Sequence, residues 1–216
     1  DNKRMTGDLL PLFPLRIVAF PHCSVPLHIF EERYKTMVGH SLRNESEFGI
    51  VLAEERGIVN VGCTVSVNEV VTRYEDGRLD IVCKGKRRFE ILTLDQGEEL
   101  LRASVQFFDD DDSSSTPALR LEALSAWEQA KPLLREAPEE RIDPTLPQLS
   151  FRLADAVPEL NARQIFLELR SEEERLKQVT AYFGGYAARL ARVTHARRVA
   201  PTNGHAAVEP RATPND

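Results

Sequence analysis

Prolines interrupt the apolar runs between Leu9 and Pro26 and restrict how this part of the chain can enter a sheet. Pro14, Pro21 and Pro26 each stand beside or inside a short apolar run. Proline lacks the backbone N–H that a strand donates to its neighbour, so these runs must be edge strands or strand ends. A charged segment follows, with apolar residues on one face of a helix. We expect that helix to run from about Glu31 to Leu42.

The rest of the sequence up to Phe108 favours short strands. Residues 48–53 form an apolar run suited to a buried strand, and residues 64–71 nearly alternate, as in a half-buried strand. Asp76-Gly77 indicates a hairpin, because this pair readily adopts positive φ. Six or so strands with one helix predict a closed or nearly closed small β-barrel.

An acidic run, Asp-Asp-Asp-Asp-Ser-Ser-Ser at residues 109–115, follows these strands. It contains no apolar side chain to bury, so we expect a mobile linker over residues 109–116. Four carboxylates could also collect a cation. Adjacent carboxylates rarely do so without a loop that turns them toward one point, and we assign no metal here.

Beyond this run the spacing of apolar residues changes to three and four, which is typical of helices. Thr116-Pro117 is an N-cap followed by proline at the first helical position. Leu146 to Val157 predict a second helix, and capping boxes at residues 161–164 and 171–174 predict two more. Gly184-Gly185 should bend the last helix or allow close packing.

These patterns predict an α+β protein with two parts. We expect a β-barrel with one helix over residues 8–108 and a helical bundle over 117–195. Residues 196–216, rich in Ala, Pro, Thr and Asn, are expected to form a disordered tail.

Four motifs carry a resemblance to a known family. The string Pro-Leu-His-Ile-Phe-Glu-x-Arg-Tyr ends at Tyr34, Asp76-Gly-Arg marks the hairpin, and Gly85-x-x-Arg-Phe lies beyond it. The Ser-Glu-Glu-Glu-Arg-Leu start of the last helix, at Ser171, also fits. Over about residues 8–193 the chain resembles the N-terminal, substrate-recognition domain of the bacterial ATP-dependent protease Lon. This resemblance implies a PUA-like β-barrel followed by a helical bundle.

The other domains of that protease have no counterpart in the sequence. No Gly-x-x-x-x-Gly-Lys-Ser/Thr string is present to cradle phosphates, so we expect no ATPase. The chain ends before a Ser-Lys protease domain could begin. We therefore expect a stand-alone form that is not an enzyme, with Met5 as a possible true start.

Charge and cysteine content favour a cytoplasmic protein. The net charge of −6 argues against a general nucleic-acid footprint. The three cysteines Cys23, Cys63 and Cys83 are an odd number without close spacing, which predicts reduced thiols. No apolar run is long enough for a membrane span, and the N-terminus lacks the apolar region of a signal peptide.

The sequence gives little support for a catalytic or metal-binding site. Ser24 lies near His22 and His28, but no Gly-x-Ser-x-Gly elbow surrounds it. His22, Cys23 and His28 could be imagined as zinc ligands, yet they lack a second ligand pair at the usual spacing. We assign no catalytic residue, metal or cofactor. A hydrolase hidden in the cleft between barrel and bundle is a remote alternative.

The one basic cluster with an adjacent aromatic residue supports a different alternative. PUA-like folds can bind RNA, so a β-turn containing these cations could contact phosphate. The simpler interpretation is a turn with solvated charges. The residues of the RNA-binding alternative are Lys84, Lys86, Arg87 and Arg88.

The proline-bracketed loop gives the leading functional hypothesis. Pro21 and Pro26 hold it extended, because a residue before proline avoids the α region. Such a loop could present apolar side chains to an unfolded polypeptide. From the family resemblance we expect a client-binding module that acts as an adaptor or chaperone-like link to a separate ATP-dependent protease. The expected client contacts are Phe20, Val25, Glu32 and Arg33.

Overall fold

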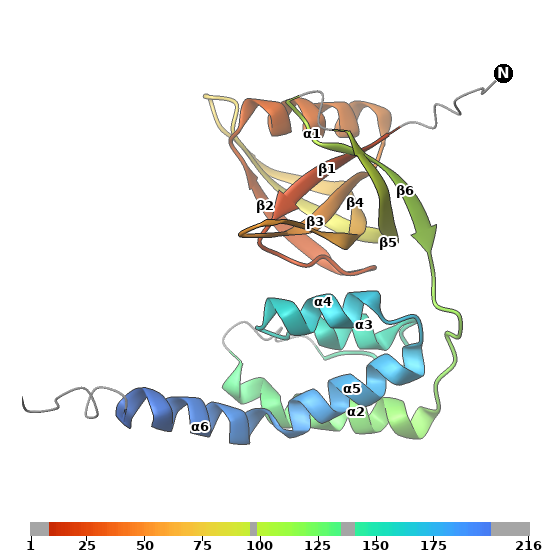
Figure 1. Ribbon diagram of the computed structural model, residues 1–216, viewed down its shortest axis with the longest axis vertical. Coiled ribbons are helices and arrows are strands. Elements are labelled where there is room, and N and C mark those ends of the chain that lie inside the picture. The colour runs from red at the N-terminus through yellow and green to blue at the C-terminus, as the bar shows by residue number, and fades with distance from the viewer. Residues whose placement is uncertain (1–8, 96–98, 135–140, 200–216) are drawn as a thin grey trace, which may run out of the picture.

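The computed structural model describes residues 9–95, 99–134 and 141–199, the last six of these by their backbone alone. The chain forms a curled sheet followed by a layer of helices, as Figure 1 shows. The sheet contains β1 (Leu10–Leu15), β2 (Ser24–Ile29), β3 (Phe48–Glu54), β4 (Gly57–Arg73), β5 (Leu79–Asp95) and β6 (Arg102–Phe108). Helix α1 (Glu32–Asn44) lies between β2 and β3. The expected α+β class is confirmed.

The strand order is β2-β5-β4-β3-β1-β6, and β6 also pairs with β5. The N-terminal half of β5 pairs with β2, whereas its C-terminal half pairs with β6. The sheet therefore curls back on itself, which is roughly the barrel expected. The hairpin between β4 and β5 turns at Gly77, which has a φ of 83°.

The helical part contains α2 (Pro117–Ala130), a short 3-10 helix (Lys131–Leu133), α3 (Leu149–Ala154), α4 (Leu160–Glu168), α5 (Glu172–Gly184) and α6 (Tyr186–Val199). The predicted caps of α2 and α5 are confirmed. The Thr116 hydroxyl accepts from the Leu119 N–H, and the Ser171 hydroxyl accepts from the Glu174 N–H.

Four local predictions about the helices were wrong. The predicted capping box at 161–164 does not open α4, which begins at Leu160 after Glu159 without a side-chain cap. The helix expected over 146–157 is limited to α3. Residues 196–199 belong to α6 rather than to a tail, and the expected tail beyond them lies outside the described residues. The single helix expected across Gly184-Gly185 is two helices in the structure, because α5 ends at Gly184 and α6, which projects from the other helices in Figure 1, begins at Tyr186.

One hydrophobic core joins the sheet to the helices, with members that include Phe20, Trp127, Phe151 and Leu176. The Phe20 and Phe151 rings stack with their centroids 5.7 Å apart. Arg163 on α4 donates to the Val18 carbonyl at 2.8 Å, and Gln164 donates to that of Val61 at 3.1 Å. The two parts are therefore packed together, and their expected boundaries stay a prediction.

Candidate functional site

A groove of about 480 Å³ opens where β1, the end of β2 and the start of α1 meet. Its apolar lining comes mainly from β1, from the residues that follow β2 and from Leu101, just before β6. Phe13 and Tyr34 are buried, and their ring centroids lie 3.9 Å apart. This close pair fixes one wall of the groove against the core.

Phe30 stands out on this groove because its side chain is apolar and exposed. The residue is 59% exposed, although it directly follows the buried Ile29. Its ring stacks with that of His28, with centroids 6.0 Å apart. An exposed aromatic ring beside an apolar depression is typical of a surface that contacts a partner.

Charged groups form the rim next to Phe30. Arg33 donates from Nε to Glu31 Oε2 at 2.9 Å, and it lies over the Tyr34 ring at 4.6 Å. Its Nη1 also approaches the Glu99 carbonyl at 3.4 Å. The guanidinium is thereby held in one orientation at the edge of the groove.

A small polar cluster supports His28 from the other side. Its Nδ1 lies 2.6 Å from Asp80 Oδ1, and the Tyr74 hydroxyl donates to Asp80 Oδ2 at 2.6 Å. The hydrogen bonds from Tyr74 and His28 lower the pKa of Asp80. The same bond to Asp80 raises the pKa of Tyr74. Asp80 therefore stays ionised and fixes the imidazole beside Phe30.

Two of the four expected client contacts are buried in the structure. Phe20 is fully buried between Phe151 and Arg163, and Val25 is 7% exposed on the inner face of β2. Neither can touch a partner without unfolding the core. Glu32 and Arg33 are exposed at the start of α1, and Arg33 lines the groove. Their role in client binding stays a prediction.

Phe30 was not among the expected client contacts, although the sequence contained a signal for its exposure. It continues the apolar run of β2 past Ile29, and successive strand residues point to opposite faces. If one of these two neighbours is buried, the other faces solvent. The sequence alone left open which of the two it would be.

The basic cluster does not form a turn or a single exposed patch, because it lies in the middle of β5. Arg88 is 2% exposed and forms a 2.6 Å ion pair with Asp110, so it is not available to phosphate. Arg87 is paired with Glu47 at 3.1 Å. Lys84 is half-buried and Lys86 is exposed. The RNA-binding alternative therefore loses Arg88.

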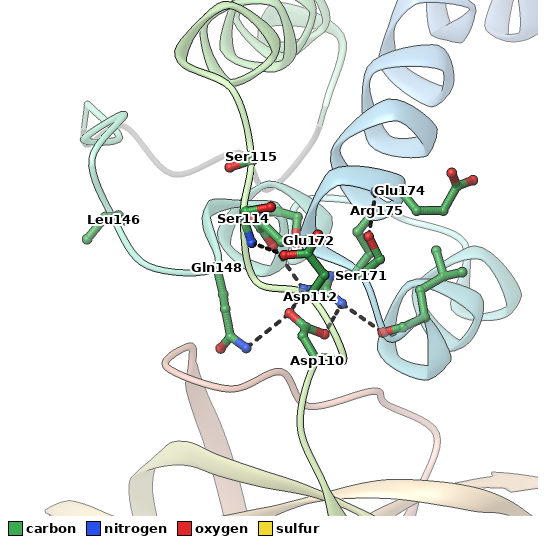
Figure 2. Close-up of polar contacts among 12 residues, drawn as sticks. Asp110, Asp112, Ser114, Ser115, Leu146, Gln148, Ser171, Glu172, Glu174 and Arg175 are labelled. Carbon is green, nitrogen blue, oxygen red and sulfur yellow. Dashed lines mark hydrogen bonds and ion pairs between the residues drawn. The ribbon is translucent and has the colours of Figure 1, made fainter.

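The acidic run does not stand apart from the folded protein. Asp110 accepts from both terminal nitrogens of Arg175, and Gln148 also donates to it (Figure 2). Arg88 on β5 donates to the same carboxylate. Burial, the largest influence, raises the pKa of Asp110, but the bonds from Arg175 and Arg88 outweigh it and lower that pKa. The expectation of an unpacked linker was wrong at this residue, because two buried guanidinium groups need its charge.

The same network continues into the helices. Arg175 also donates to Glu172 at 2.9 Å, and Glu172 accepts from the Ser150 hydroxyl at 2.5 Å. The Asp111 N–H donates to the Arg170 carbonyl, and the Glu172 N–H donates to the Asp112 carbonyl. This network fastens the acidic run to α3 and α5.

The residues considered for catalysis and zinc binding are dispersed. Cys23 is buried, and its thiol faces the Phe151 carbonyl at 3.7 Å. Within the described residues no hydrogen bond joins Ser24 to His22 or to His28. No three His, Cys, Asp or Glu side chains in that part of the chain are grouped to hold a metal ion. Nor does any described helix have the length and apolar character needed to cross a membrane.

Comparison with known proteins identifies the family. The family model of the ATP-dependent protease La (LON) substrate-binding domain matches residues 9–183. The Lon protease of Azospirillum brasilense is 25% identical over 197 residues, which are 83% of this chain and 24% of that protein. The Lon protease of Anaeromyxobacter dehalogenans is 28% identical over 165 residues, 72% of this chain and 19% of that protein. The chain thus spans about a quarter or less of these relatives.

Solved structures agree with this assignment. A Lon N-terminal domain protein from Xanthomonas campestris is 27% identical, with a TM-score of 0.64, and the match covers 81% of this chain and 98% of that one. The N-terminal domain of the Mycobacterium avium complex Lon protease shares the fold at 18% identity, with a TM-score of 0.58, over 82% of this chain and 99% of that one. The chain belongs to the Lon substrate-binding domain family.

Proposed function

We propose that this protein binds exposed apolar segments of unfolded polypeptides through the groove beside Phe30. The observation that carries the proposal is the 59% exposed Phe30 ring next to the apolar wall of Phe13 and Leu101. An apolar client side chain would cover the ring and fill the groove, removing both from water. The charged rim, above all Arg33 and Glu31, would then orient the client backbone.

The family supports a role connected with proteolysis. Its description names a substrate-binding domain, and the matched relatives are Lon proteases. We propose that the protein has no enzymatic activity of its own and acts as an adaptor or chaperone-like partner of an ATP-dependent protease. Its three cysteines are free and buried, which fits the reducing cytoplasm where such proteases work.

The test compares two apolar side chains of equal exposure. Phe30 is 59% exposed at the groove, and Leu121 is 58% exposed on α2 in the helical part. Binding of a permanently unfolded, carboxymethylated protein is followed by fluorescence anisotropy. Phe30→Ala should weaken binding about five- to thirtyfold, as loss of a buried aromatic contact does. Leu121→Ala should leave the affinity unchanged.

Two outcomes of this experiment would contradict the proposed client site. If both variants bind the unfolded protein as tightly as the parent chain, the groove is not the client site. If both weaken it equally, the binding depends on general surface hydrophobicity and not on the groove. Thermal melts of both variants are recorded beside the binding curves, because each removed side chain is largely exposed and should leave the fold intact.

A further inference from the structure

A second depression, of about 490 Å³, lies at the junction of sheet and helices and differs in character from the groove. Cationic side chains reach it from three separate segments. Lys84 comes from β5, Arg141 from the segment before α3, and Arg152 from α3 itself. One carboxylate, Asp143, also lines it, and its Oδ1 accepts hydrogen bonds from the backbone N–H and the hydroxyl of Thr145. This basic pocket stands on a protein whose net charge is −6.

The cations in the pocket are not all neutralised by neighbours. Among the described residues, neither Lys84 nor Arg141 forms an ion pair. Arg152 lies 3.9 Å from Asp155 on its own helix. Lys84 is only half-exposed, so a carboxylate that met it there would be partly shielded from water and salt.

Backbone hydrogen bonds cross the wall of the pocket, and two of its lining residues have positive φ. The His22 N–H donates to the Gly85 carbonyl at 3.0 Å, and the Gly85 N–H donates to that of Cys23 at 2.9 Å. A Cβ on Gly85 would come within 1.9 Å of the Phe20 carbonyl oxygen, so only glycine allows this close approach. His22 and Gln148 both line the pocket and both have positive φ, at 63° and 49°. Such strain in non-glycine residues is concentrated at binding sites.

The exposed face of β2 connects the pocket to the groove. Ser24 lines the pocket, His28 lines the groove, and the exposed Pro26 lies between them on the same face. Ser24 is paired with Lys84, and His28 with Asp80. Four residues of strand span roughly 13 Å, which is the reach of about four residues of an extended peptide. One extended segment can therefore touch both depressions.

We propose that the basic pocket binds an acidic side chain of the same polypeptide whose apolar residue occupies the groove. The protein would then select extended segments in which a Glu or Asp lies about four residues from an aromatic or large aliphatic residue. This inference rests on the proposed function and adds its substrate class. Lys84 and Arg141 supply the charge, and the Phe30 groove supplies the apolar contact.

The test uses labelled extended peptides with one apolar triplet. In one peptide, two Glu residues lie about four residues after the triplet. In a second peptide they lie about four residues before it. In the control peptides Gln replaces each Glu. We expect one Glu peptide to bind the full chain about fivefold more tightly than its Gln control at low salt, from ion pairs of ordinary strength. This difference in affinity should shrink at roughly 0.5 M salt, because exposed charges are then screened.

Variants distinguish the pocket from general attraction. The double change Lys84→Gln and Arg141→Gln should abolish the preference for Glu, whereas Lys86→Gln should keep it. Lys86 is the matched control, because it carries the same charge on the same strand but does not line the pocket. Circular dichroism melts confirm that each variant is folded.

Each outcome decides between the two proposals. If Glu and Gln peptides bind with equal affinity, the groove is retained and the acidic selectivity is wrong. If neither peptide binds, the proposed function fails and the selectivity fails with it. If a short RNA competes better than the Glu peptide, and does so only when Lys84 and Arg141 are present, the pocket is a phosphate site instead.

Discussion

Arg88 on β5 and Asp110 after β6 form an ion pair with a 2.6 Å separation, and both side chains are 1% exposed. Arg175 on α5 binds the same carboxylate with two nitrogens at 2.7 Å. One acidic side chain thus joins the sheet, the connecting segment and the helices. A buried charge of this kind is costly to leave without its partners.

Replacing Asp110 by Asn should therefore destabilise the protein strongly. Two guanidinium groups would lose their common carboxylate in a buried site, which costs about 3–5 kcal/mol in the free energy of unfolding. Urea denaturation measures the change. Asp111→Asn is the matched control, since this neighbour is exposed and should cost at most about 0.5 kcal/mol. Equal effects of the two changes would contradict a special role for Asp110.

The same carboxylate should make stability depend on pH. The pKa of Asp110 is lowered in the folded protein, so its contribution is present above the unfolded value of about 3.9 and is lost as pH falls through the folded pKa. The stability difference between the parent chain and Asp110→Asn should hold from pH 7 to about 5 and then shrink below about pH 4. A difference that grows on acidification would show that the sign is wrong.

Cleavage within the acidic run offers an independent test of the same contacts. We expect an Asp-specific protease to cut residues 109–112 slowly in the parent chain, because backbone hydrogen bonds hold this run to Arg170 and Glu172. In Asp110→Asn the rate should rise at least several-fold. A first cut here at equal rates in both proteins would instead indicate an unpacked linker.

The three thiols should be inert in the folded protein. Burial raises the pKa of Cys23, Cys63 and Cys83 to about 12, and the charge of Asp155 adds to this at Cys23. At pH 8 only about one thiol in ten thousand would then be ionised. A thiol reagent should react slowly with the native protein. In guanidinium it should react with all three thiols. Ser24→Cys, an exposed neighbour of Cys23, should add one fast thiol. A rapid reaction of the native protein that lacks the Ser24→Cys change would contradict the prediction.

Features decided by neighbouring residues could be predicted from the sequence. The caps at Thr116 and Ser171 and the turn at Gly77 each depend on a few adjacent residues. Side-chain chemistry and spacing were enough there. The change from strand to helix periodicity likewise marked the two parts of the fold.

Features decided across the chain could not be predicted. The composition of the acidic run describes the average of its residues. One of them, Asp110, is buried because it pairs with Arg175, which lies 65 residues further along the chain. Phe20 is buried because Phe151 on α3, far away in the sequence, covers its ring. Nothing within the proline-bracketed segment contains that information.

The two phenylalanines provide a direct comparison between core and surface. Phe20 is fully buried against Phe151, with Arg163 over its ring at 5.1 Å, whereas Phe30 is 59% exposed. Phe20→Ala should lower the free energy of unfolding by about 3–5 kcal/mol, from lost burial and the cavity left behind. Phe30→Ala should change it by less than about 0.5 kcal/mol.

Urea denaturation and client binding, measured on both variants, separate these roles. Under conditions where Phe20→Ala is still folded, its affinity for the unfolded client should match that of the parent chain, because the ring touches only the core. Phe30→Ala should show the reverse pattern, with parental stability and weakened binding. If Phe20→Ala keeps its stability and loses binding, the ring must leave the core to meet the client, and the contact surface is the proline-bracketed loop after all.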